Sequence, residues 1–273
     1  MLEMQKKDLK RISYEIRKQL LTTVYKNRTG HLASSLSCVE LMVSLYFGDI
    51  LNFRAKDPEW EDRDRFILSK GHAALTLYYV LGEAGYFDKE LVSSFCLEGT
   101  IFGGLAMYGK IPGIETTSGS LGHGLSFASG VAMMGKLCNK SYKVYTLVGE
   151  GELNEGENWE AAAFIAHNHL INHTLIIDKN GVQATGYNKD ILSMDNLVKK
   201  WKAFGFYTIE VNGHDTSEIL DALNEKVDKP KTIIAHTVKG KGLTFLENRK
   251  DCHYIIPNEE EYKMGLLNLE QEV

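Results

Sequence analysis

Between residues 144 and 236, short apolar runs alternate with amphipathic stretches, and this alternation constrains the fold more than any other feature. Strands are predicted over 144–148, 173–177, 207–211 and 232–236. Helices are predicted between them, over 157–169, 193–203 and 216–227. Strand-helix-strand alternation of this length is typical of a parallel sheet with helices on both faces. We therefore predict an α/β fold whose ligands bind at the carboxyl ends of the strands.

The part of the chain before residue 144 combines helices with long loops. Helices are predicted over 9–27, 37–47, 74–81 and 126–136. One further short strand is predicted over 66–69, and the glycine-rich stretch 112–124 leaves no room for regular structure. We expect this part to cover the sheet and to contribute loops to the ligand site.

The charge balance and the cysteines exclude several classes of function. The 273 residues carry a formal net charge of −5, so no positive field attracts nucleic acid or an anionic membrane. No apolar run approaches the roughly 20 residues that a membrane span needs. The four cysteines lie far apart and form no C-x-x-C pair, which is typical of a reduced, intracellular protein. We expect a cytoplasmic protein that binds neither nucleic acid nor membrane.

Two polar residues lie just past the ends of predicted strands. Glu150 comes after the run 144–148, and Asn180 comes after the run 173–177. Because adjacent parallel strands end at the same edge of a sheet, their side-chain oxygens should lie close together. Such oxygens are the ligands that Mg²⁺ prefers, and the metal would allow a carboxylate to approach a diphosphate. From these residues alone, an acidic surface turn that caps a helix is an equal alternative.

Longer motifs carry a resemblance to a known family. The stretch G-E-G-E-L-N-E-G at 149–156, with Asn180 about thirty residues further on, is similar to the thiamine diphosphate signature. That signature also occurs in 2-oxo-acid dehydrogenase α subunits. Other matching stretches narrow the choice, at 28–37, 69–73, 111–126, 212–215 and 235–242. Together they resemble the transketolase family, and within it the short chains that contain only the N-terminal, diphosphate-binding half.

The resemblance implies one diphosphate-binding domain of the thiamine diphosphate-binding fold over residues 1–273. In the family, pyrimidine-binding and C-terminal domains follow, and active sites form between the two kinds of domain. Neither later domain is expected in this chain. We therefore expect a partner chain that carries the pyrimidine-binding half, in an α₂β₂ assembly, and no activity from this chain alone.

The resemblance also implies the residues that hold the cofactor. Its metal site corresponds to Glu150, Asn180 and the main-chain carbonyl of Val182, with Mg²⁺ as the metal and Ca²⁺ or Mn²⁺ as substitutes. The implied cofactor-binding residues are His72, Gly119, Leu121, Gly151 and Asn180, with His72 and Gly151 at the diphosphate and Gly119 and Leu121 at the aminopyrimidine ring. Lys239 and Lys241 are either solvated charges or help to order the loop over the diphosphate.

Two histidines match catalytic positions of the family. His31 and His253 correspond to histidines near the reactive thiazolium carbon and the bound sugar. A ketose donor must lose a hydroxyl proton before its C2–C3 bond breaks, and imidazole accepts or relays a proton near neutral pH. The implied reaction transfers a two-carbon ketol unit from a ketose phosphate to an aldose, with thiamine diphosphate as the electron sink.

Three positions depart from the family pattern. Glu150 stands where aspartate is usual, and Cys252 stands where a tryptophan usually precedes His253. Leu105 stands where many relatives carry a histidine, so one sugar contact is missing unless Tyr108 replaces it or the donor differs. Because Asn180 and its spacing are intact, we expect the metal still to bind.

Two alternative functions follow from these features. The first is a non-catalytic homologue whose metal site has lapsed through Glu150 and Leu105. The second is a subunit that decarboxylates a 2-oxo acid with the same cofactor. His31 and the stretches at 69–72 and 118–124 argue against the second alternative.

Overall fold

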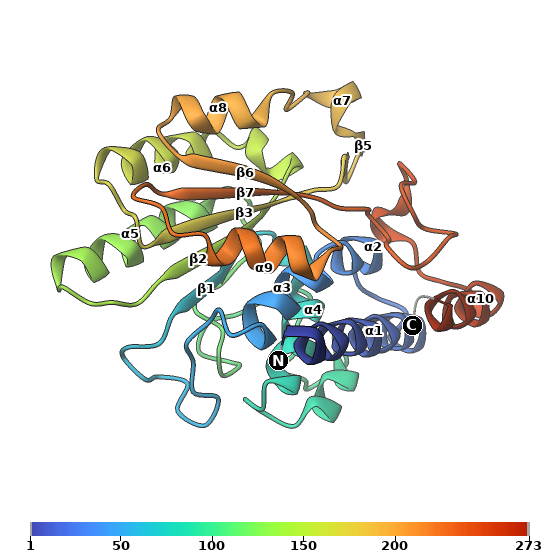
Figure 1. Cartoon of the computed structure of the whole chain (residues 1–273). Coiled ribbons are helices and arrows are strands. Elements are labelled where there is room, and N and C mark those ends of the chain that lie inside the picture. Colours follow the sequence, from blue (N-terminus) through green and yellow to red (C-terminus); the bar gives the residue numbers. More distant parts are fainter. Residues whose placement is uncertain (1, 272–273) are drawn as a thin grey trace.

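Residues 2–271 are described in a computed structural model, with side chains from residue 9 onward. Five parallel strands form the main sheet, in the order β1-β2-β3-β7-β6 (Figure 1). These strands are β1 (Arg65–Leu68), β2 (Val144–Gly149), β3 (His173–Lys179), β6 (Tyr207–Asn212) and β7 (Lys231–His236). The predicted parallel α/β fold is confirmed, and every strand expected from the sequence is present.

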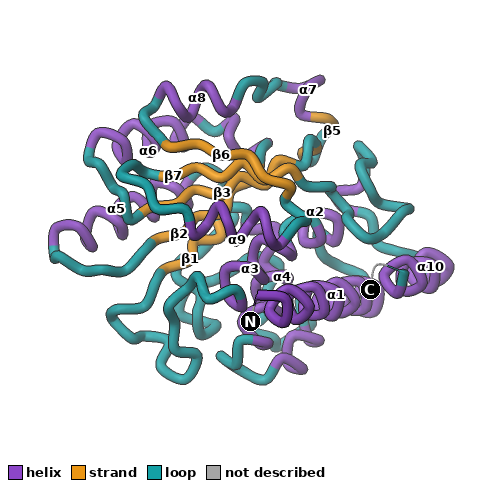
Figure 2. Tube along the Cα trace, in the orientation of Figure 1, coloured by secondary structure: helices purple, strands orange, loops and turns teal. Residues whose placement is uncertain are grey.

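Helices cover both faces of the sheet, as the tube in Figure 2 shows. The helices on one face are α5 (His123–Leu137), α6 (Gly156–His167) and α8 (Leu197–Ala203). Those on the other are α3 (Val39–Phe47), α4 (Ala74–Glu83) and α9 (Thr216–Asn224), with α1 (Leu2–Asn27) packed outside them. Both faces are therefore covered by helices, which explains why central strands such as β2 are continuous apolar runs.

The strands divide their side chains between two cores. Along β2, Tyr145 and Leu147 pack into the core beneath α3 and α4, whereas Val144 and Val148 pack into the core beneath α5 and α6. This division follows from the two-residue period of a strand, which turns successive side chains to opposite faces. The alternation fixes the register of the sheet, because a shift by one residue would exchange the two cores.

Several elements were not predicted from the sequence. They are α2 (Leu32–Leu36), the hairpin β4 (Val182–Gln183) and β5 (Gly186–Tyr187), α7 (Asn188–Ile191), α10 (Glu259–Glu270) and the short 3₁₀ turns η1 (Gly71–Ala73), η2 (Lys89–Ser94), η3 (Gly151–Asn154) and η4 (Cys252–Tyr254). Helix α8 begins at 197 rather than at the predicted 193, because Asn196 adopts a left-handed φ of 59°. Within the described range, no helix combines the length and the apolar character that a membrane crossing requires.

The strand register brings three loops to one edge of the sheet. Gly149 on β2 pairs with Asp178 on β3, and Asp178 pairs with Ala235 on β7. The residues that follow these strands therefore begin side by side, although they lie far apart in the sequence. This edge is the carboxyl edge, where open parallel sheets bind ligands.

His173, the first residue of β3, makes stability depend on pH. Its side chain is fully buried and Nε2 lies 3.0 Å from Oγ1 of Thr146. Burial lowers the pKa of His173 to about 3. Between pH 7.5 and 5.5 the unfolded chain takes up a proton at this residue and the native chain does not, so acidification is expected to cost about 1.4 kcal/mol of stability. Urea unfolding at the two pH values would measure this loss of stability. The His173→Gln variant should lose about 1.4 kcal/mol less than the native chain over the same pH change. Equal losses in the two proteins would contradict the prediction.

Candidate active site

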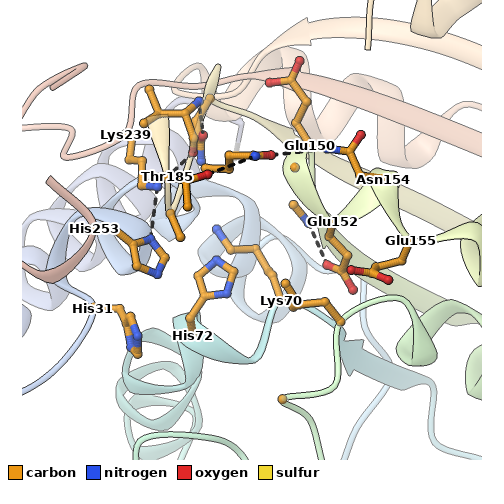
Figure 3. A pocket seen from close by; sticks show the side chains of 18 of the residues that line it. His31, Lys70, His72, Glu150, Glu152, Asn154, Glu155, Thr185, Lys239 and His253 are labelled. Carbon is orange, nitrogen blue, oxygen red and sulfur yellow. Dashed lines mark hydrogen bonds between the residues drawn. The ribbon is translucent and has the colours of Figure 1, made fainter. Parts of the chain in front are cut away.

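A cavity of about 580 Å³ lies at the carboxyl edge of the sheet (Figure 3). All nine residues that the family resemblance assigns to metal, cofactor or catalysis line it: His31, His72, Gly119, Leu121, Glu150, Gly151, Asn180, Val182 and His253. They come from six separate stretches of the chain. The fold therefore brings the whole predicted set to one place.

Three histidines form one end of the cavity. His31 precedes α2, His72 lies in η1 after β1, and His253 lies in η4 after β7. The ring centroids of His31 and His253 are 5.0 Å apart, those of His72 and His253 are 5.5 Å apart, and those of His31 and His72 are 6.0 Å apart. Such spacing leaves the three rings in contact with a common space, as Figure 3 shows.

Burial keeps these histidines uncharged. Loss of water lowers the pKa of His31, His72 and His253, and the nearby ammonium of Lys239 lowers each further. The pKa of His253 falls to about 3. At neutral pH all three rings are therefore neutral imidazoles. Each can accept a hydrogen bond from a substrate at one nitrogen and donate one at the other.

The predicted metal ligands lie where the strands β2 and β3 end. Oε2 of Glu150 accepts hydrogen bonds from the amide of Gly181 (2.9 Å) and from Nδ2 of Asn188 (2.7 Å). Oδ1 of Asn180 accepts from the amide of Val182 at 3.1 Å. In Figure 3 the Glu150 carboxylate points away from the three histidines. The Glu150 carboxylate and the histidines therefore point to different parts of the cavity, whereas the carbonyl of Val182 is linked to His253 through Lys239.

The surroundings of Glu150 fit an oxygen-liganded divalent cation. Glu150, Asn180 and Val182 line the same cavity and carry a carboxylate, an amide oxygen and a main-chain carbonyl, which are ligands that Mg²⁺ and Ca²⁺ prefer. Nearby, Oδ1 of Asn154 and Oδ1 of Asn188 are buried without any hydrogen-bond donor. A Cβ at Gly151 would lie 2.8 Å from Cβ of Gln183, so only glycine allows the close approach of these loops.

Lys239 supplies a buried positive charge to the cavity. Its side chain is only 2% exposed, so the alternative of a solvated charge is wrong for this residue. Nζ donates to the carbonyl of Val182 at 2.9 Å and lies 3.3 Å from Nδ1 of His253. Burial lowers the pKa of Lys239 to about 8, and within the described residues no carboxylate forms an ion pair with it. An unpaired buried ammonium at a cavity wall favours an anionic ligand.

An ion pair that the sequence did not reveal lies beneath the cavity. Lys70 and Asp178 are completely buried and form a salt bridge. Asp178 also accepts hydrogen bonds from Oγ of Ser37 (2.6 Å), from Nδ2 of Asn180 (3.2 Å) and from Oγ1 of Thr237. Burial raises the pKa of Asp178, but Lys70 and these donors outweigh it and lower the pKa overall. The charged pair ties four loops of the site together.

Glu152 is a second buried acid that connects loops of the site, and it was not assigned from the sequence. It is 3% exposed and accepts hydrogen bonds from Oγ of Ser69, from the amide of Gly122 (2.9 Å) and from the amide of Gly149 (3.0 Å). Burial raises its pKa despite these donors. Glu152 therefore fixes the loop after β2 against the loops before α4 and α5.

Leu105 forms an apolar wall of the cavity. A Cβ at Gly119 would lie 2.7 Å from Cδ1 of Leu105, so the leucine packs directly against the glycine predicted to hold the aminopyrimidine ring. Tyr108 is 61% exposed and does not line the cavity. In this chain, Tyr108 therefore does not replace the histidine that many relatives carry at position 105.

Comparison with known protein families agrees with the class that this fold and cavity define. Residues 9–264 match the model described as the transketolase, thiamine diphosphate-binding domain. The chain belongs to the transketolase family. The predicted family and the predicted fold are therefore both confirmed.

Individual relatives resemble nearly the whole chain. It is 41% identical over 245 residues to one of the subunits of the apulose-4-phosphate transketolase of Actinobacillus succinogenes, covering 89% of this chain and 88% of that one. It is 36% identical over 268 residues to a 6-deoxy-6-sulfo-D-fructose transketolase subunit of a Clostridium species, covering 97% of each. The solved transketolase of Campylobacter jejuni has a TM-score of 0.90 at 30% identity, covering 96% of this chain and 42% of that one. These similarities confirm the predicted transketolase-type subunit, and none favours a 2-oxo-acid decarboxylase.

Proposed function

We propose that the chain is the thiamine diphosphate-binding subunit of a two-chain transketolase that transfers a ketol unit from a ketose phosphate to an aldose. One observation carries the proposal: a single cavity is lined by three close, neutral histidines and by Glu150, Asn180 and Val182. The relatives from Actinobacillus succinogenes and the Clostridium species have names that refer to apulose 4-phosphate and 6-deoxy-6-sulfo-D-fructose. Together with the apolar Leu105, this supports a donor other than the common pentose and hexose phosphates.

The cofactor end of the cavity suits a metal-bound diphosphate. Glu150, Asn180 and the carbonyl of Val182 would hold Mg²⁺, for which Ca²⁺ or Mn²⁺ could substitute. Lys239 would offset the charge of the diphosphate, because it is a buried ammonium without an acidic partner among the described residues. The remaining predicted contacts to the cofactor are His72, Gly119, Leu121 and Gly151. When bound, thiamine diphosphate supplies the electron sink for breaking the carbon–carbon bond.

The hydrogen-bonding environments of His31 and His253 indicate different roles for the two side chains. The Lys239 ammonium can only donate, so Nδ1 of His253 accepts and the ring carries its proton on Nε2. His253 would therefore donate a hydrogen bond to a sugar oxygen. The side chain of His31 makes no hydrogen bond to any described residue, and its pKa is lowered by burial. His31 would therefore accept the hydroxyl proton of the donor.

A partner chain would complete the site. The curated relatives above are named as subunits, and the solved relative is more than twice as long as the matched region. On α5 and α6, large apolar side chains are exposed to solvent: Phe127, Met134, Leu137 and Phe164. Such a surface supports an α₂β₂ assembly with the pyrimidine-binding chain. We place this assembly in the cytoplasm, where a reducing environment suits four free cysteines.

The chain alone is expected to be inactive, and addition of the pyrimidine-binding chain should restore ketol transfer, because the active site would form between the two. A coupled assay with a panel of ketose phosphates, thiamine diphosphate and Mg²⁺ measures this. Turnover by the purified single chain would refute partner dependence. If the two-chain complex bound no thiamine diphosphate, the non-catalytic alternative would be favoured instead.

A further inference from the structure

Asn188 contacts the glutamate that replaces the usual aspartate of the metal site. It begins α7, directly after the hairpin β4–β5, and only 3% of it is exposed. Nδ2 of Asn188 donates to Oε2 of Glu150 at 2.7 Å. A carboxylate only accepts hydrogen bonds, so the amide nitrogen must face it and Oδ1 must face away. No motif in the sequence pointed to this residue.

Both ends of the hairpin bind the side chain of Glu150. Its Oε2 accepts from the amide of Gly181, which precedes β4, and from Asn188, which follows β5. The amide of Asn188 in turn donates to the carbonyl of Gly181 at 2.9 Å and closes the hairpin. Within the described residues, Oε1 of Glu150 accepts no hydrogen bond. One carboxylate oxygen is thus fixed, and the other is left without a protein donor.

The hairpin also carries another predicted metal ligand. Val182 begins β4, one residue after Gly181, and it lines the cavity. Fixing the hairpin against Glu150 therefore fixes the carboxylate and the Val182 carbonyl relative to each other. The extra methylene of glutamate, compared with aspartate, extends the carboxylate toward the hairpin by about one carbon–carbon bond. Asn188 offers a donor at the place that this extension reaches.

We propose that Asn188 is a positioning residue of the metal site, which holds Oε2 of Glu150 so that Oε1 remains available to the divalent cation. This inference rests on the proposed function. Asn188 and Glu150 act as a pair, in which the amide compensates for the longer acid. Groups that hold metal ligands by hydrogen bonds commonly change metal affinity by roughly 10–100-fold when they are removed.

A double-substitution cycle with Mn²⁺ as the probe tests this pairing. In the two-chain complex saturated with thiamine diphosphate, free Mn²⁺ is measured by electron paramagnetic resonance. Asn188→Ala is expected to raise the Kd for Mn²⁺ by roughly tenfold or more in the native background. In the Glu150→Asp background it should change the Kd less than about twofold, because the shorter acid retreats from Asn188. Equal effects in both backgrounds, or none in the native one, would overturn the proposal.

Two controls separate this role from general destabilisation. Asn172→Ala removes an asparagine whose Nδ2 also donates one hydrogen bond, to the carbonyl of Ala132 at 3.1 Å, but outside the cavity. It should leave the Kd for Mn²⁺ unchanged. If Asn188→Ala folds poorly, Asn188→Ser provides a second test, with a hydroxyl too short to reach Glu150. Hydrogen exchange of the Gly181 amide should accelerate in either Asn188 variant. Unchanged exchange together with an unchanged Kd for Mn²⁺ would refute the positioning role of Asn188.

The outcomes also distinguish this inference from the proposed function. If the native complex binds no Mn²⁺ in the presence of thiamine diphosphate, both the metal site and the role of Asn188 fail. If the native complex binds Mn²⁺ and Asn188→Ala binds it equally well, only the role of Asn188 fails.

Discussion

Lys70→Met is expected to lower the free energy of unfolding by about 3–5 kcal/mol, because it leaves the carboxylate of Asp178 buried without its counter-charge. Both side chains of the pair are completely buried. The three hydrogen bonds to Asp178 cannot replace a full positive charge. Urea unfolding at pH 7, followed by circular dichroism, would measure the loss.

A surface lysine provides the matched control. Lys140 forms an exposed ion pair with Asp62, so Lys140→Met should leave the unfolding curve nearly unchanged. The double variant Lys70→Met with Asp178→Leu should recover part of the loss, since no unpaired charge then stays buried. If Lys70→Met were as stable as the Lys140 variant, the pair would have no structural role.

His31→Ala should lower kcat for ketol transfer by about 10²–10⁴-fold, the range typical of a lost general base. The affinity for thiamine diphosphate should change little, because the proposed diphosphate contacts, such as Lys239 and Gly151, are untouched. Tyr254→Phe is the matched control, since its ring lies 5.2 Å from that of His31 and only a hydroxyl is removed. A kcat for His31→Ala close to that of the control would exclude His31 as the proton acceptor.

The pH profile gives an independent readout of His31. Burial and Lys239 lower the pKa of His31 below its usual value of 6.5. A base acts in its neutral form, so activity should persist as pH falls through 6.5 and decline only at lower pH. A rate profile for the two-chain complex between pH 5 and 8 would show this. An acid limb centred above pH 6.5 would contradict it.

The sequence was sufficient for the sheet because its central strands are apolar on both faces. The run 144–148 and its counterparts could only be buried on both sides, which required helices above and below. The placement of Glu150 and Asn180 at one edge of the sheet also followed, since each comes just after a strand and parallel neighbours end together. The positions of the histidines could not be predicted from the strand pattern. His31 and His253 lie in loops without a periodic pattern, so only the family motifs predicted that they share one site.

The contacts that organise the site could not be predicted in the same way. Lys70 and Asp178 meet because β1, β2 and β3 are neighbours, and no spacing in the sequence encodes the pairing of two particular side chains. Lys239 resembled a solvated charge because it follows a strand and lies beside a glycine and close to another lysine. Its burial depends on the loop folding back over the cavity to reach the carbonyl of Val182.

Strand pairing in this sheet joins distant parts of the chain, and this affects how the chain folds. β1 meets β2 through Arg65 and Val144, and β3 meets β7 through Thr174 and Lys231. Long loops must close before these contacts form, a topology associated with slow folding. The cavity is complete only when these strands are paired, so the cofactor can recognise only a late, nearly native species. Its binding energy would therefore slow unfolding rather than accelerate folding.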